Sequence, residues 1–201
     1  FEAEGIDYET AESAPGRGNI WAKIEGGDEP SLILLQHTDV VPAEEEFWTI
    51  DPLSGDIRDG YILGRGTRDM KGLGVIQLAT FLSLHRSGVE LNRDVIFLAT
   101  ADEEAGGYFG VGWLIDNRPE IFEDAGILLN EGGGGSRSED GDIVFGIEVT
   151  QKVPVWLRLN AIDIPGHGSS PRTTSSVTRI IQALNILLEL QYHFKLILFI
   201  S

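Results

Sequence analysis

His37 and Asp39 stand two residues apart within residues 36–42 and could form one corner of a metal site. Residues two apart on a strand point to the same face, so the imidazole could bind a metal while the carboxylate holds the ring from behind. The pair decides little alone, because a single His at a strand end is more often a histidine with ordinary hydrogen bonds. Three other clusters in the chain give the pair its weight.

Each of these clusters follows the expected end of a hydrophobic strand and carries at least one carboxylate. They are residues 64–72 with Asp69, residues 101–107 with Glu103 and Glu104, and residues 130–133 with Glu131. Taken singly, Asp69 could cap a helix, the Glu pair could be solvated surface and the glycines could be turn residues. Their joint occurrence in this order favours one shared site.

The chemistry that this set could perform is hydrolysis at a pair of metal ions. Such a pair needs a bridging carboxylate, further His or carboxylate ligands and a base for the attacking water. His37 could bind one ion, Asp69 could bridge the two, and Glu104 and Glu131 could each add a carboxylate. The neighbours Glu103 and Glu104 would diverge on an extended strand end, which predicts that one binds metal and the other acts on water. The chain has no cysteine, so thiolate ligands are excluded.

The elements that must position these clusters alternate between strands and helices. We expect a hairpin beginning at residues 20–25 that feeds a buried strand at 32–35, a helix at 70–86, a buried strand at 95–101, a helix at 110–117 and a buried strand at 126–130. This order predicts an α/β layer whose ligand crevice lies outside the carboxyl ends of the strands. The pattern then changes to strands at 143–150 and 155–164 and a helix at 175–190.

Composition limits the class of partner. The chain has 15 basic and 32 acidic side chains in 201 residues, a net charge of −17, which disfavours nucleic acid and anionic membrane surfaces. Its hydrophobic content of 42% is enough for a core. The apolar stretch 184–200 is interrupted by Glu189, His193 and Lys195, which favours a buried element over a membrane span. The chain starts without a signal-peptide pattern, so the cytoplasm is the default expectation.

The chain resembles the amidohydrolases of metallopeptidase family 20, which include carboxypeptidases, aminoacylases, acetylornithine deacetylase and succinyl-diaminopimelate desuccinylase. The matching segments lie at residues 37–42, at Trp48 with 55–60, at 64–72, at 102–104 and at 130–132. The resemblance implies a partial three-layer αβα catalytic domain of the zinc-exopeptidase type at residues 1–150. The start of a smaller α+β lid or dimerisation domain would follow at residues 151–201.

The resemblance also implies roles for the site residues. His37 and Glu131 would serve opposite metals, Asp69 would bridge them, Glu104 would bind one of them and Glu103 would be the catalytic base. Asp39 would hold the His37 ring from behind without binding the metal itself, and the peptide bond after Asp69 would be cis. His167, between two glycines, would stabilise the oxyanion in the partner subunit's site of a homodimer; as a turn histidine it would have no such role. Two divalent ions are implied, zinc first, with cobalt or manganese as alternatives.

The family pattern includes one further histidine ligand that this sequence does not supply. His193 matches no motif of the family and is not assigned. We therefore expect the 201 residues to be part of a longer enzyme and to have little activity alone. The substrate implied is a small peptide or an N-acyl amino acid. The alternatives are a noncatalytic relative that acts by binding, and a structural metal binder rich in carboxylates.

Overall fold

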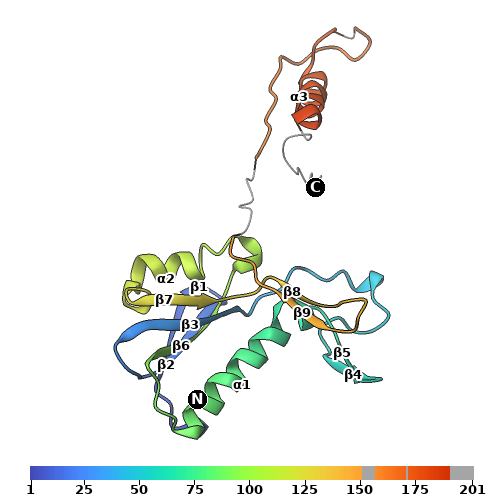
Figure 1. The fold of residues 1–201 in the computed structure, drawn as a ribbon. Coiled ribbons are helices and arrows are strands. Elements are labelled where there is room, and N and C mark those ends of the chain that lie inside the picture. Colours follow the sequence, from blue (N-terminus) through green and yellow to red (C-terminus); the bar gives the residue numbers. More distant parts are fainter. Residues whose placement is uncertain (151–156, 171, 191–201) are drawn as a thin grey trace. The chain divides into compact units, whose positions relative to one another are not determined.

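The structure is a computed structural model that describes residues 1–150, 157–170 and 172–190 (Figure 1). The chain divides into two compact units, Phe1–Glu148 and Val149–Ser201. The sequence predicts domains at residues 1–150 and 151–201, and the assignment of a catalytic and a lid role to the two parts stays a prediction.

The first unit is built on a mixed sheet with the strand order β1-β2-β6-β3-β7. The strands are β1 (Tyr8–Ala14), β2 (Arg17–Ile24), β3 (Glu29–His37), β6 (Arg93–Thr100) and β7 (Ala125–Leu129). β3 runs parallel to both β6 and β7, whereas β1 and β2 pair antiparallel, as do β2 and β6. The carboxyl ends of β3, β6 and β7 therefore share one edge of the sheet.

The hairpin expected between residues 20–25 and 32–35 is wrong. β6 lies between β2 and β3, and the true hairpin partner of β2 is β1, across a turn in which Gly16 has a φ of +74°. The reason is burial: β6 is the most continuously apolar strand, and the central place buries it from Val95 to Thr100.

Two helices cover opposite faces of this sheet, which confirms the predicted α/β layering (Figure 1). Helix α1 (Gly72–Ser87) places Phe81 against Leu34 and Phe97 on one face. Helix α2 (Val111–Asn117) places Leu114 against strand residues of opposite parity on the other face, Ile33 and Leu98 among them. Side chains alternate between faces along a strand, so a fully apolar strand contributes side chains to the hydrophobic cores on both faces of the sheet.

The helices begin and end close to their expected limits. α1 was expected at 70–86 and ends at Ser87, followed by Gly88, which has a φ of +60° and donates its N–H to the His85 carbonyl. α3 (Ser176–Leu190), in the second unit, was expected at 175–190. Short helical turns occur at Glu2–Glu4, Glu45–Phe47, Thr67–Lys71, Glu103–Ala105 and Pro119–Ile121. Among the described helices, none has both the length and the apolar character that a membrane crossing requires.

Several strands differ from expectation. β7 was expected to be buried, but its side chains are exposed because, within the described residues, it pairs only with β3. The strand expected at 143–150 is shorter, β9 (Ile143–Gly146), and pairs with an unpredicted strand, β8 (Gly134–Arg137). The strand expected at 155–164 is absent from its described part, 157–164, and residues 155 and 156 lie outside the described residues. A further hairpin was not predicted. It pairs β4 (Asp56–Arg58) with β5 (Tyr61–Leu63), and its turn residues, Asp59 and Gly60, both have positive φ.

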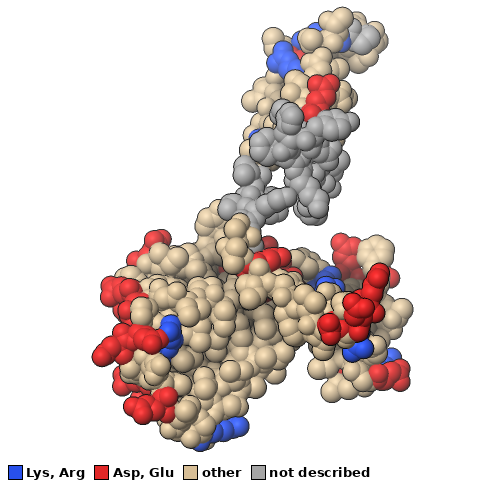
Figure 2. All heavy atoms as spheres, in the orientation of Figure 1, with Lys and Arg blue, Asp and Glu red and all other residues tan. Residues whose placement is uncertain are grey.

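The surface reflects the acidic composition. Figure 2 shows acidic side chains spread over the visible face with fewer basic ones among them. Several of the basic ones are paired, as Arg86 is with Glu4 and Lys23 is with Asp94.

Candidate metal centre

The four clusters predicted from the sequence meet at the shared carboxyl edge of the three parallel strands. His37 is the last residue of β3, Glu103 and Glu104 follow β6, and Glu131 follows β7. Asp69 lies in the turn that leads into α1. This turn does not use Asp69 as a cap, because α1 begins without a side-chain capping bond.

His37 is the centre of the group, with a ring that is only 2% exposed. Its Nε2 atom lies 3.1 Å from Asp69 Oδ1, 3.6 Å from Glu131 Oε1 and 3.8 Å from Glu103 Oε2. Two groups of residues could each hold a metal ion: His37 with Asp69 and Glu104, and His37 with Glu103 and Glu131. Within each group, the possible ligand atoms all lie within 4.8 Å of one another. The structure thus brings together all four predicted metal ligands and the predicted base.

The other ring nitrogen of His37 faces Asp39. Nδ1 lies 3.0 Å from the Asp39 carbonyl oxygen and 3.5 Å from its Oδ1 atom. Because a carbonyl only accepts, we assign a proton to Nδ1, which leaves Nε2 as the atom that can bind a metal once it is deprotonated. The main support for the ring is therefore the backbone of Asp39, and its carboxylate lies slightly farther away.

Glu103 and Glu104 do not lie on an extended strand end, as their sequence positions suggested. They lie in the helical turn Glu103–Ala105, which begins after Asp102 adopts a φ of +69°. The two side chains nevertheless enter different ligand sets, Glu104 with Asp69 and Glu103 with Glu131. The turn thus separates the neighbours by helical rotation instead of strand alternation.

The position of Asp69 depends on a glycine turn and on a buried sulfur. Gly66 has a φ of +84°, and a Cβ atom there would lie 2.5 Å from Val40 Cγ1. The Met70 sulfur accepts the backbone N–H of His37 at 3.3 Å, which joins the end of β3 to the residue next to Asp69. The Asp69–Met70 peptide bond is cis, as the resemblance implied.

The electrostatics of the cluster favour protonation. Burial and the neighbouring Asp69 carboxylate raise the pKa of Glu131 to about 7. Burial, with the charges of Asp69 and Glu103, raises the pKa of Glu104. Burial alone would lower the pKa of His37, but the Asp39 carbonyl and the surrounding carboxylates raise it overall. Bound protons reduce the repulsion between these carboxylates, and a bound cation would do the same in place of the protons.

The donor set fits a divalent metal. It offers one imidazole nitrogen and four carboxylates, ligand types that zinc accepts and that cobalt or manganese also accept. Asp69 belongs to one ligand set, and its charge raises the pKa of Glu131, which belongs to the other set.

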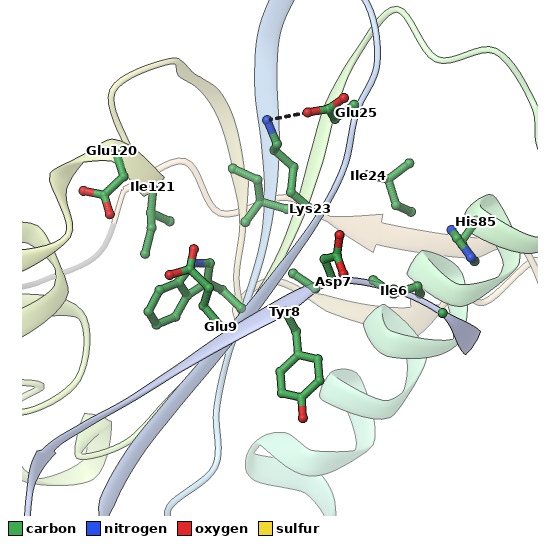
Figure 3. A pocket seen from close by; sticks show the side chains of 14 residues that line it. Ile6, Asp7, Tyr8, Glu9, Lys23, Ile24, Glu25, His85, Glu120 and Ile121 are labelled. Carbon is green, nitrogen blue, oxygen red and sulfur yellow. Dashed lines mark ion pairs between the residues drawn. The ribbon is translucent and has the colours of Figure 1, made fainter. Parts of the chain in front are cut away.

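Two other features do not belong to these ligand sets. His167 belongs to the second unit, where its Nδ1 atom lies 2.8 Å from Ser169 Oγ, and its role stays a prediction. A hollow of about 720 Å³ lies between the start of β1 and the end of β2. Figure 3 shows the side chains that line it, with the Lys23–Glu25 ion pair among them. None of the residues predicted for the metal site lines it.

Sequence reasoning did not identify Arg17, Asn19 and Asp102 as supports of the site. Asn19 and Asp102 are buried polar residues that hydrogen-bond to the turn after β6. The available signal was the position of Asn19, which has the same parity along β2 as the core residue Trp21. A polar side chain at an inward strand position needs a partner, and this one finds it in the turn.

Comparison with known proteins identifies the family and the fold. Residues 33–193 match the family described as Peptidase family M20/M25/M40. Aminoacylase-1 of Sus scrofa is 33% identical over 160 residues, and succinyl-diaminopimelate desuccinylase of Methylobacterium radiotolerans is 40% identical over 113 residues. An M20 family metallo-carboxypeptidase of Sulfolobus solfataricus has a similar fold, with a TM-score of 0.54 at 23% identity.

These matches cover much of this chain and a smaller share of each relative. The aligned part is 79% of this chain and 38% of the aminoacylase, and 54% of this chain and 29% of the desuccinylase. For the carboxypeptidase structure, it is 68% of this chain and 30% of the other. Since the family match spans well over half of the 201 residues, the predicted resemblance is confirmed, and the chain belongs to peptidase family M20/M25/M40.

Proposed function

We propose that this chain forms the metal-binding part of a hydrolase that cleaves the amide bond of a small peptide or an N-acyl amino acid. The observation that carries the proposal is the meeting of His37 with four carboxylates at the carboxyl edge of parallel strands. The relatives named as an aminoacylase, a desuccinylase and a metallo-carboxypeptidase support amide hydrolysis as the class of reaction.

The site would hold two divalent ions, with zinc as the first choice. His37 and Glu131 would bind opposite ions, Asp69 would bridge them and Glu104 would complete one of the two. The proximity of Asp69 Oδ1 to His37 Nε2, at 3.1 Å, supports a shared metal environment. When bound, such ions make water more acidic and polarise the scissile carbonyl.

Glu103 would move the proton of the attacking water to the leaving nitrogen. Its side chain is 49% exposed, so it can reach a substrate from the surface of the site. Its backbone N–H is held by Asp39, which limits the positions of the carboxylate. A carboxylate held near the water can accept the proton from the water and then donate it to the leaving nitrogen.

Asp39 and His167 would have supporting roles. Asp39 would act on the metal ligand His37, and His167 would act on the substrate. Asp39 would keep the His37 ring in place through Nδ1. His167 would donate to the developing oxyanion of the partner subunit's site in a homodimer. The experiment for His167 is a mixture of two inactive variants, His167→Ala and Glu103→Gln. Recovery of activity on mixing supports a shared site, and its absence contradicts one.

The direct test is metal analysis and a substrate screen on the full-length protein. We expect two zinc ions per chain and hydrolysis of N-acyl amino acids or dipeptides. Glu103→Gln should keep the metal and lower kcat by about 100- to 10,000-fold, the usual contribution of a general base. A protein that binds ligands without turnover, or an unchanged rate in Glu103→Gln, would contradict the proposal.

A further inference from the structure

The turn over residues 101–110 carries the proposed base and one proposed ligand, and buried polar side chains hydrogen-bond to its two ends. Asp102 opens this turn with a φ of +69° and is 3% exposed. A buried carboxylate is costly unless charges or hydrogen bonds compensate it. Asp102 has both kinds of partner, although its own side chain is absent from the metal-ligand sets.

The two carboxylate oxygens of Asp102 have separate partners. Oδ1 lies 3.2 Å from Arg17 Nε, and Oδ2 accepts the backbone N–H of Phe109 at 3.1 Å. The carbonyl oxygen of Asp102 also accepts the N–H of Gly107 at 2.6 Å. One residue therefore joins the beginning of the turn to its end and to strand β2.

Asn19, on β2, holds the same turn at both ends. Its Oδ1 accepts the N–H of Ala101 at 3.0 Å, and its Nδ2 donates to the carbonyl of Phe109 at 3.1 Å. The Asn19 residue is 2% exposed, so water does not compete readily for these bonds. The closure is also tight, because a Cβ atom on Gly110 would lie 1.9 Å from the Ala101 carbonyl oxygen.

We propose that Asn19 and Asp102 are positioning residues that set the places of Glu103 and Glu104, with Arg17 as the charge partner of Asp102. This inference rests on the proposed function. Asn19 and Asp102 hold the two ends of the turn, while Asp39 accepts the N–H groups of Glu103 and Glu104 between them. The turn that presents these two carboxylates is therefore held at its ends and at the two residues themselves.

The informative substitution at Asp102 is Asp102→Asn. Both partners of the carboxylate are donors, Arg17 Nε and the Phe109 N–H, and an amide has only one acceptor oxygen. The new NH₂ group must therefore face a donor. Arg17→Ala tests the same link from a side chain that is 45% exposed, so it disturbs the core less. Asn19→Ala removes both bonds from β2.

The test uses the full-length protein, with Zn²⁺ titrated against a chromophoric chelator and Co²⁺ absorption as a spectroscopic probe. We expect Asp102→Asn and Asn19→Ala to lower the affinity for the ion held by Glu104 and to lower kcat, each by about 10- to 100-fold. KM should change less than kcat, and the Co²⁺ spectrum should shift. Arg17→Ala should resemble Asp102→Asn, and Arg17→Lys should restore part of the loss.

Glu4→Gln is the matched control, because it breaks the Arg86 ion pair of the same unit with no contact to the turn. It should lower the melting temperature and leave metal affinity and kcat unchanged. Folded variants of Asn19, Asp102 and Arg17 that behave like this control would overturn the inference. A wild-type protein that neither binds Zn²⁺ nor hydrolyses amides would instead overturn the proposed function, so the two failures are distinct.

Discussion

The Asp39 carboxylate accepts the backbone N–H of Glu103 at 3.1 Å through Oδ1, so the residue predicted to support the metal ligand also holds the proposed base. Its Oδ2 atom accepts the N–H of Glu104 at the same distance. The carbonyl of Asp39 meanwhile accepts from His37 Nδ1. A single residue thus ties the end of β3 to the turn after β6.

Asp39→Asn should separate these two functions. The backbone carbonyl on His37 Nδ1 is kept, whereas one of the two N–H groups loses its acceptor to an amide NH₂. We expect kcat/KM to fall by about 10- to 100-fold, with a smaller fall in Zn²⁺ affinity, because the ring support is largely intact. Steady-state kinetics and chelator competition measure the two effects. An exposed acid of the same unit, in Asp28→Asn, is the control, and equal behaviour of the two variants would contradict the assignment.

Metal affinity should rise with pH. Burial and Asp69 raise the pKa of Glu131 to about 7, and the pKa of His37 is raised as well, so protons occupy both ligands below neutral pH. A metal must displace these protons, and Zn²⁺ affinity should therefore fall between about pH 8 and about pH 6. Calorimetry in buffers of different ionisation enthalpy counts the protons released. Binding at about pH 6 without net proton release would contradict the cited shifts.

In the metal-free protein, the contribution of the Glu131 carboxyl to folding stability should fall as the pH rises. Its pKa is raised from 4.5 in the unfolded chain to about 7, so the folded state binds more protons over that range. Stability from this group is present at low pH and is lost as the pH rises toward about 7. Urea unfolding of the metal-free full-length protein, compared with Glu131→Gln, checks the sign. A wild type that gains stability relative to the variant over this range would be inconsistent with it.

The meeting of the side chains of the site could be predicted because most of them lie at or just after the end of an apolar strand. His37 ends β3, Glu103 and Glu131 come shortly after β6 and β7, and parallel strands place their carboxyl ends together. The pairing of β2 could not be predicted in the same way. Its neighbour β6 begins at Arg93, far along the chain, and local alternation does not distinguish it from β3. Asn19 was missed for the same reason, since its partners Ala101 and Phe109 follow β6.

The side chains of β7 are more exposed than its sequence predicts. Ile127, Leu128 and Leu129 form a continuous apolar run, which is typical of a strand covered on both faces. In the described residues they are 45%, 47% and 50% exposed. An apolar run predicts that a strand forms, but the elements that cover it are set by tertiary contacts elsewhere.

Gly66→Ala should destabilise the unit and weaken metal binding. The change places a Cβ in a backbone conformation at φ +84° and 2.5 Å from Val40 Cγ1, beside the turn that carries Asp69. The matched control is Gly16→Ala, which has a similar φ of +74° and nothing within 4 Å of its Cβ. The control should cost about 1–2 kcal/mol from backbone strain alone, and Gly66→Ala should cost more. Urea unfolding gives both values, and equal costs would show that the Val40 contact relaxes freely.

The Lys23–Asp94 pair should contribute stability that is lost in acid. Burial alone would raise the pKa of Asp94, but the Gly26 N–H and the Lys23 ammonium, 2.9 Å from Oδ2, lower it overall. A carboxyl with a lowered folded pKa stabilises the protein above its unfolded pKa, near 3.8, and the contribution disappears as the pH falls through the folded pKa. Because the pair lies near the surface, its worth at neutral pH is at most about 1 kcal/mol and shrinks in salt. Urea unfolding of Asp94→Asn against wild type should therefore show a gap at neutral pH that closes at low pH. The ion pair requires the ionised form of Asp94, which disappears in acid. A stability difference between the two proteins that persists in acid would therefore place the effect in packing around Gly26.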